Sequence, residues 1–184
     1  MINNIPLIAE VKTKSPFGYK SSKSWGYLFD LANRYGDIIS IHTDSRWGGS
    51  FDYISKAREL TTKQILAKGI HRNDYEVERA IEYGADLVLV VGRIPEIYQN
   101  RCLIEPRSLG DLKNIPPEFK VVWNSRDLET GGLKKETFEE ARKIWSGWLC
   151  QASNISATGD IKNGADAVLV GSKLEEFCDS LHNI

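Results

Sequence analysis

Three apolar runs of the chain end in lysine or glutamate side chains that could transfer protons. Glu10 and Lys12 close the first run, Lys68 closes another, and Glu105 closes a third. Lysines and carboxylates that share one partly dehydrated cavity shift each other's pKa values, and this arrangement suits general acid and base catalysis. The alternative interpretation is that the four residues form structural ion pairs.

A fourth apolar run leads into a polar cluster, "VVWNSRDLET" at 121–130. Because side chains alternate along a strand, Asn124 and Arg126 are predicted to point to one side and Ser125 to the other. We therefore expect Asn124 and Arg126 to contact a substrate, while Asp127 holds the turn that follows.

An anion site is predicted where the last apolar run turns into a helix. Gly171 and Ser172 would offer free backbone N–H groups there, although Gly-Ser is also a common helix cap. Residues 12–24 form a long basic segment that we interpret as a flap over an anionic substrate or as a solvated loop. Trp47 is predicted to line the pocket or to pack beneath a loop.

The elements that must position these residues are visible as alternating patterns. Apolar runs without strict alternation indicate parallel strands buried on both faces. Eight such runs occur, at 5–12, 37–44, 64–68, 86–91, 101–106, 120–125, 148–153 and 166–171. Amphipathic stretches lie between them at 24–36, 50–61, 72–84, 134–147 and 172–183. The pattern predicts a single α/β domain over 1–184, a (β/α)8 TIM barrel whose active site lies at the carboxyl ends of the strands.

Two details refine this barrel prediction. The segments "YGADLVLVVG" (83–92) and "NGADAVLVGS" (163–172) are similar, which suits strands four and eight half a barrel apart. Residues 93–100 and 106–118 are short and broken by proline, so helices four and five are expected to be missing or reduced to a turn. An open doubly wound sheet is the alternative fold, although it normally has fewer strands.

Composition excludes several classes of function. With 24 basic and 25 acidic residues, the chain has no bulk charge to attract nucleic acid or a membrane. Three separated cysteines and no long apolar run indicate a soluble cytoplasmic protein. His42 and His71 are isolated, which argues against a metal site, and Ser125 and Ser153 have no histidine placed for a Ser-His-Asp triad.

In combination these motifs resemble the indole-3-glycerol phosphate synthase family, which is a family of (β/α)8 lyases in tryptophan biosynthesis. The matching segments run in order through nearly the whole chain: "AEVKTKSP" resembles A-E-x-K-x-x-S-P, "TDSRWGGSFDYI" the second-strand segment, "LAKGI" the L-x-K-D-F strand, "CLIEP" the L-I/V-E strand, "NSRDLET" the N-x-R-D-L motif and "GADAVLVGSKL" the phosphate-binding end.

The resemblance implies ring closure and decarboxylation of 1-(2-carboxyphenylamino)-1-deoxyribulose 5-phosphate without a metal or organic cofactor. It implies that Lys68 is a general acid on the carbonyl, that Glu105 is the base in loss of the hydroxyl, and that Glu10 and Lys12 orient and protonate. The substrate contacts that it implies are Asn124, Arg126 and Ser15 for hydroxyls and carboxylate, and Ser153, Gly171 and Ser172 for phosphate. Another subunit of the tryptophan pathway is the partner that it suggests.

The chain also departs from the family pattern. Ala152 and Asn154 stand where the strand-seven motif S-E-S-G has glutamate and glycine, and Gly69-Ile70 replaces Asp-Phe after the catalytic lysine. The extension before strand one, with its extra helix, is not expected here. A non-catalytic or substrate-shifted descendant that binds a sugar phosphate is therefore the alternative function. A phosphoribosylanthranilate isomerase is disfavoured, because Glu10 and Lys12 stand where that family has its cysteine base.

Overall fold

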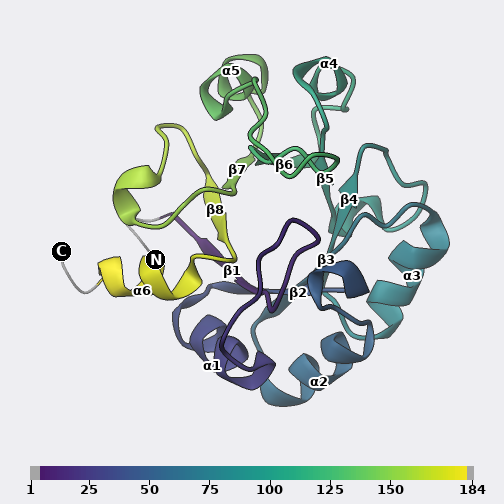
Figure 1. The fold of residues 1–184 in the computed structure, drawn as a ribbon. Helices are drawn as coiled ribbons and strands as arrows, with labels where there is room; N and C mark the ends of the chain where they lie inside the picture. Colours follow the sequence, from purple (N-terminus) through teal and green to yellow (C-terminus); the bar gives the residue numbers. More distant parts are fainter. Residues whose placement is uncertain (1–4, 182–184) are drawn as a thin grey trace.

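The computed structural model describes residues 5–181, and in it the eight strands form a closed parallel barrel in sequence order, β1 to β8. Viewed along the barrel axis, the strands make the inner ring and the helices lie outside it (Figure 1). The predicted TIM barrel is thus confirmed. The extreme ends of the predicted domain and the end of its last predicted helix lie outside the described residues.

Each strand lies within one of the eight predicted apolar runs. The strands are β1 Leu7–Val11, β2 Ile38–His42, β3 Gln64–Lys68, β4 Leu87–Val91, β5 Cys102–Glu105, β6 Lys120–Asn124, β7 Leu149–Ala152 and β8 Ala167–Val170. The longer helices are α1 Trp25–Tyr35, α2 Asp52–Leu60, α3 Asp74–Glu82, α5 Phe138–Ile144 and α6 Leu174–Ser180. Over residues 5–181, every helix falls short of the length and apolar character that crossing a bilayer requires.

Shortened connections explain how the barrel fits into so few residues. The β4–β5 connection carries only the 3-10 turn η2, Gln99–Arg101, and the β5–β6 connection only the single turn α4, Leu109–Leu112. The expected reduction of helices four and five is therefore confirmed. The β7–β8 connection is reduced as well, to the 3-10 turn η3, Thr158–Asp160.

Two apolar clusters fill the fold. The larger one lies between the strands and the outer helices, and it includes the fully buried Trp123 and Phe177. The smaller one fills the barrel interior, and its buried members are Ile8, Leu66, Leu89, Leu103, Val122, Cys150, Ala152, Ala167 and Leu169. Since each strand contributes alternate residues to this interior, the next inward position toward the carboxyl end falls at the barrel mouth.

An aspartate joins neighbouring strands at the amino-terminal end of the barrel. Asp86, just before β4, accepts a hydrogen bond from the backbone N–H of Ile65 at 2.8 Å and returns one from its own backbone N–H to the Ile65 carbonyl at 2.9 Å. Asp166 makes the same two bonds to Leu149 before β8, at 2.8 and 2.9 Å. Asp37 makes the same two bonds to Leu7 before β2, both at 2.9 Å. We call the arrangements at Asp86 and Asp166 the aspartate clamps, because an arginine is added to each of them.

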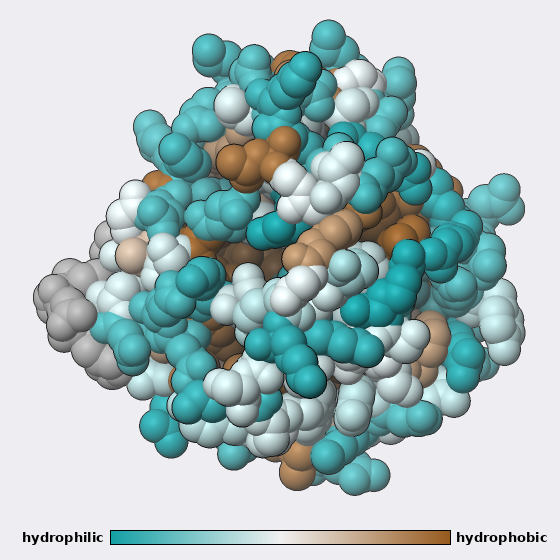
Figure 2. All heavy atoms as spheres, viewed as in Figure 1, coloured by the Kyte–Doolittle hydropathy of each residue, from teal (hydrophilic) through white to brown (hydrophobic). Residues whose placement is uncertain are grey.

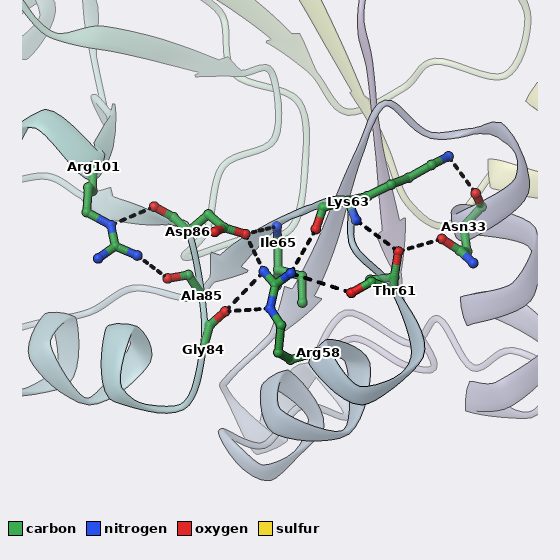
Figure 3. A network of polar contacts seen from close by, with 9 residues as sticks. All are labelled: Asn33, Arg58, Thr61, Lys63, Ile65, Gly84, Ala85, Asp86 and Arg101. Carbon is green, nitrogen blue, oxygen red and sulfur yellow. Dashed lines mark hydrogen bonds and ion pairs between the residues drawn. The ribbon is translucent and has the colours of Figure 1, made fainter.

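An arginine completes both clamps at equivalent positions. Arg58 stands seven residues before Ile65 and binds the Gly84 carbonyl and the Asp86 carboxylate (Figure 3). Arg142 stands seven residues before Leu149 and binds the Gly164 carbonyl and the Asp166 carboxylate. The similarity between the segments before β4 and β8 therefore reflects a repeated strand junction, as the sequence predicts.

Candidate active site

One layer of side chains at the barrel mouth carries most of the charge in the interior. It continues the alternation above Ile8, Leu66, Leu103 and Cys150, and its members come from the four odd-numbered strands: Glu10, Lys68, Glu105 and Ala152. Both glutamates are only 2% exposed. Layers of four side chains from alternate strands are the usual filling of such barrels, so here three titratable groups replace aliphatic ones.

Glu10 is held by groups from two neighbouring strands. Lys68 donates from Nζ to Glu10 Oε2 at 3.1 Å, and His42 Nε2 lies 2.7 Å from Glu10 Oε1. On its other side, a Cβ added at Gly171 would collide with the Glu10 carboxylate, which explains why glycine follows β8. The carboxylate is therefore fixed between an ammonium, an imidazole and the backbone.

Glu105 belongs to a second hydrogen-bonded chain. Asn124 donates from Nδ2 to Glu105 Oε1 at 2.9 Å, and its Oδ1 accepts from Ser153 Oγ at 2.6 Å and from the Arg126 backbone N–H at 3.0 Å. These contacts determine which way the Asn124 amide points. The orientation of Glu105 is consequently coupled to the ends of β6 and β7.

The two buried glutamates have pKa values that move in opposite directions. Burial alone would raise the pKa of Glu10, but Lys68, Lys12 and His42 outweigh burial and hold it well below the ordinary value. Burial raises the pKa of Glu105, and the opposing effects of Lys68 and Asn124 do not cancel it. Such a separation assigns different tasks to two carboxyl groups, with Glu10 a fixed anion and Glu105 able to exchange a proton.

Three adjoining cavities open at this mouth, and we name them by position. The central cavity, of about 40 Å³, is lined by Lys12, His42, Trp47, Lys68, Gly69, Ile70, Leu89, Val91, Glu105, Asn124, Arg126, Leu128 and Ser153. The β8 cavity, of about 30 Å³, shares Lys12, Lys68, Arg126 and Ser153 with it and adds residues that include Gly171, Ser172 and Lys173. The outer cavity, of about 390 Å³, lies on the other side. Figure 2 shows hollows with hydrophobic residues in their depths and hydrophilic residues around them on this face.

The β8 cavity is rich in positive charge. Lys12, Lys68, Arg126 and Lys173 line it, and Glu10 is the carboxylate among its lining residues. Burial lowers the pKa of Lys12, with Lys68 and Arg126 acting in the same direction and Glu10 opposing them. An anion that enters this cavity would relieve the repulsion among these cations.

Ser153 and Asn154 both have left-handed backbones, with φ of 72° and 56°. Asparagine tolerates this region better than most residues, so Asn154 can adopt it at the position where the S-E-S-G motif has glycine. Ala152, by contrast, leaves the fourth position of the layer without a charge.

The β1–α1 segment, the predicted flap, folds over the mouth as a small hairpin (Figure 1). Its strands are joined by hydrogen bonds from Ser15 N–H to the Tyr19 carbonyl and from Ser21 N–H to the Thr13 carbonyl, both 2.8 Å. Phe17 at its tip packs edge-on against Trp47, with ring centroids 6.2 Å apart. Trp47 is buried and lines the central cavity, so both predicted roles for it are seen together.

Other residues lie differently from the sequence-based expectation. Ser15 lies in the hairpin, where its Oγ accepts from the Phe17 N–H at 3.3 Å, and it lines none of the three cavities. Thr43 and Asp44 directly follow strand two, and they bond to the Lys68 carbonyl and to the Arg46 backbone N–H. The strand-two residue that lines the central cavity is His42.

His42 and Lys134 are the residues that the sequence analysis missed. His42 is buried against Glu10 and stacks parallel to Trp47, with centroids 5.6 Å apart. Lys134 donates to the Pro106 carbonyl at 3.2 Å and lines the outer cavity with Glu105. Its charge opposes the rise that burial causes in the pKa of Glu105. Counting inward positions from Ile38 and Ser40 would have found His42, whereas Lys134 follows a turn and carries no comparable signal.

Two solved structures share this barrel fold. A 3-hexulose-6-phosphate synthase superposes with a TM-score of 0.68 and 15% identity, covering 96% of this chain and 99% of that chain. The same enzyme from Salmonella typhimurium gives 0.68 and 16%, covering 97% and 94%. At this identity the likeness shows the barrel fold alone.

Sequence comparison is more specific. The family model for indole-3-glycerol phosphate synthase matches residues 2–109, which hold Glu10, Lys12, Lys68 and Glu105. The indole-3-glycerol phosphate synthase of Geobacillus sp. (strain WCH70) is 32% identical and covers 93% of this chain and 76% of its own length. The tryptophan biosynthesis protein TrpCF of Vibrio parahaemolyticus is 33% identical, over 91% of this chain and 40% of its own. The chain therefore belongs to the indole-3-glycerol phosphate synthase family.

Proposed function

We propose that this protein converts 1-(2-carboxyphenylamino)-1-deoxyribulose 5-phosphate into indole-3-glycerol phosphate, with release of carbon dioxide and water. The observation that carries the proposal is the layer of Glu10, Lys68 and Glu105, in which one lysine lies between two carboxyl groups with opposite pKa shifts. Ring closure on a ketone needs an acid at the carbonyl oxygen, and loss of the hydroxyl needs proton transfer. Family membership supports this reaction.

Lys68 is the general acid in this proposal. Its Nζ donates to Glu10, which holds the ammonium toward the central cavity while the ring carbon attacks the substrate carbonyl. Loss of carbon dioxide then removes the carboxylate from that carbon. Glu105, oriented by Asn124, accepts the proton that must leave as the hydroxyl is lost. Lys12 and Glu10 orient the substrate and assist protonation.

The remaining site residues bind the two ends of the substrate. The cationic β8 cavity takes the phosphate, with Ser153, Gly171 and Ser172 at its wall. Arg126 and Asn124 contact hydroxyls and carboxylate, Trp47 covers the aromatic end, and Ser15 reaches the substrate only if the hairpin shifts. A cytoplasmic location and a partner from the tryptophan pathway complete the proposal, and the TrpCF relative supports the latter.

The proposal is tested by incubating the purified chain with the synthetic substrate and recording indole fluorescence. Lys68→Ala and Glu105→Gln are expected to lower kcat by roughly 100-fold or more, the usual contribution of a positioned acid or base. Lys135→Ala, at an exposed position, is the matched control. Absence of turnover by folded wild-type protein would reject the lyase.

A second candidate, a barrel that binds a sugar phosphate without catalysis, is favoured by one observation. Ala152 supplies no charge at the position where the family's strand-seven motif has glutamate. This candidate predicts that indole-3-glycerol phosphate raises the melting temperature while no indole fluorescence develops from the substrate. Restoring the acid with Ala152→Glu would then be expected to produce turnover.

A further inference from the structure

The outer cavity has no role in the chemistry described above, although it adjoins the reacting groups. It shares Ile70, Val91, Glu105 and Leu128 with the central cavity, so the two spaces are separated by a neck of three apolar side chains beside one carboxyl group. With a volume of about 390 Å³ it is the larger space by far. A bound molecule that fills the central cavity can therefore extend into it.

The direction in which the substrate lies follows from the two walls of the central cavity. The side shared with the β8 cavity presents Lys12, Lys68 and Arg126, which suit the phosphate and the ketose. The side shared with the outer cavity is apolar and suits the aromatic ring. This orientation rests on the proposed function, and it places the aromatic ring of the substrate at the neck.

The volumes of the two cavities also place the aromatic ring at the neck. A benzene molecule occupies a cavity of about 150 Å³ in an engineered protein, so the central cavity of about 40 Å³ cannot enclose an aryl ring. The outer cavity is more than large enough for a ring and leaves space beyond it. Ile70 at the neck stands where the L-x-K-D-F motif has phenylalanine, and the smaller side chain widens the passage.

Beyond the neck the cavity is polar. Arg107 and Lys134 line it, and within residues 5–181 the Arg107 guanidinium makes no hydrogen bond or ion pair. Arg46 is already bound to Asp44, and the Asp127 carboxylate already accepts from two backbone N–H groups. The exposed carboxylate of Glu129 lines the cavity as well. Arg107 is thus an exposed, hydrated donor at the cavity wall that is not bound to another side chain.

We propose that the outer cavity is an extended aryl subsite, which admits amino-ketose phosphates whose anthranilate ring carries a further anionic substituent. The carbon that attacks and the carbon that bears nitrogen lie on one edge of the ring, so substituents at ring positions 4 and 5 point away from Lys68 and Glu105. These positions direct a substituent through the neck toward Arg107 and Lys134. The ring chemistry is unchanged, because the added group takes no part in it.

The test uses carbonyl-reduced substrate analogues, which cannot cyclise, so binding is measured by calorimetry without any need for turnover. Three ring types are compared: unsubstituted, substituted with carboxylate at position 4 or 5, and substituted at the same positions with the neutral nitro group of similar shape. Wild-type protein is expected to bind at least one carboxylate analogue more tightly than its nitro counterpart, by roughly tenfold for a charge-assisted hydrogen bond.

Two variants test the width of the neck and the charge of Arg107 separately. Ile70→Phe narrows the neck and is expected to weaken substituted analogues relative to the unsubstituted one by roughly tenfold. Arg107→Met is expected to abolish the preference of carboxylate over nitro. Ile144→Phe and Arg34→Met, at exposed positions on α5 and α1, are the controls and should change neither ratio.

The outcomes distinguish this subsite from the proposed function. If the unsubstituted analogue binds and every substituted analogue is excluded, the subsite is rejected while the lyase stands. Equal weakening of all analogues by Ile70→Phe also rejects it. If no analogue binds to folded protein, the proposed function and the subsite fail together.

Discussion

At the scale of single residues, Glu10 depends on a neighbour that no motif indicates. His42 contacts its carboxylate at 2.7 Å from the next strand, and burial lowers the pKa of this imidazole, although Glu10 opposes that shift. A neutral imidazole can donate its one N–H to the carboxylate. Positioning of Glu10, and through it of Lys68, is therefore shared between β1, β2 and β3.

His42→Leu is expected to lower kcat roughly tenfold with little change in KM, because removing a polar contact to a buried charged group costs about 1.5 kcal/mol or more. Steady-state kinetics by indole fluorescence measure both constants. His42→Gln retains a donor and should recover part of kcat. Equal activity of the leucine and glutamine variants would show that the contact does not orient Glu10.

Lys134 gives a prediction about pH. Burial raises the pKa of Glu105 and Lys134 opposes that effect, so Lys134→Met should raise the pKa further. Because Glu105, as the proposed base, accepts a proton only when ionised, the acid limb of kcat/KM is expected to move to higher pH. Lys135→Met, a neighbouring exposed change, should leave the limb in place. A limb that moves to lower pH in Lys134→Met would contradict the assignment.

The sequence predicts most of the site at this scale, since the ends of parallel strands must converge. Glu10, Lys68, Glu105, Asn124 and Arg126 were identified in this way, and all five line the central cavity or the β8 cavity. His42 was missed because which residue of a strand points inward depends on where the strand begins. Thr43 follows β2 and points elsewhere.

At the scale of elements, the β1–α1 hairpin is held down at its tip. Gly131 has φ of +77°, and a Cβ added there would overlap the Phe17 ring. The neighbouring Gly132 has its nearest atom at 3.5 Å, an ordinary contact. The turn after β6 thus packs against the Phe17 ring, and this contact requires glycine at position 131 but not at position 132.

Gly131→Ala is expected to release the hairpin and raise KM several-fold, because the cover over the substrate is lost. It should also speed tryptic cleavage within residues 12–24, which contain four lysines. Gly132→Ala is the matched control for both measurements. Unchanged cleavage in Gly131→Ala would show that Phe17 does not hold the hairpin closed.

Helix lengths were predictable where the amphipathic pattern is long and proline is absent. The stretch 24–36 contains α1 at Trp25–Tyr35, and 50–61 contains α2 at Asp52–Leu60. The outer cavity could not be predicted, since it forms where residues from five separate segments of the chain meet. No local sequence pattern predicts which of these side chains leave a cavity between them.

At the scale of the whole molecule, the two aspartate clamps lie four strands apart in the ring, before β4 and β8. Asp86→Ala and Asp166→Ala each leave a backbone N–H without an acceptor and remove the carboxylate partner of an arginine. Each is expected to lower the free energy of unfolding by about 1–3 kcal/mol, and the double variant by the sum of the two.

Urea unfolding measures these effects, with exposed Asp30→Ala on α1 as the control. Because the clamps lie at the end of the barrel opposite the mouth, kcat/KM at low temperature is expected to be unchanged. A double variant that loses far more than the sum would indicate that the two halves of the ring depend on each other. Loss of activity in either single variant would place the clamps within reach of the site.

Gly171 also bears on the order in which the protein is made. During synthesis Glu10 leaves the ribosome well before the backbone that passes beside its carboxylate, because that backbone follows β8. Until that strand pairs with β1, the acid has neither its full burial nor its final neighbours. A nascent chain that has folded its first seven strands would therefore hold Glu10, Lys68 and Glu105 without a complete site. The proposed catalysis would begin only when β8 closes the barrel.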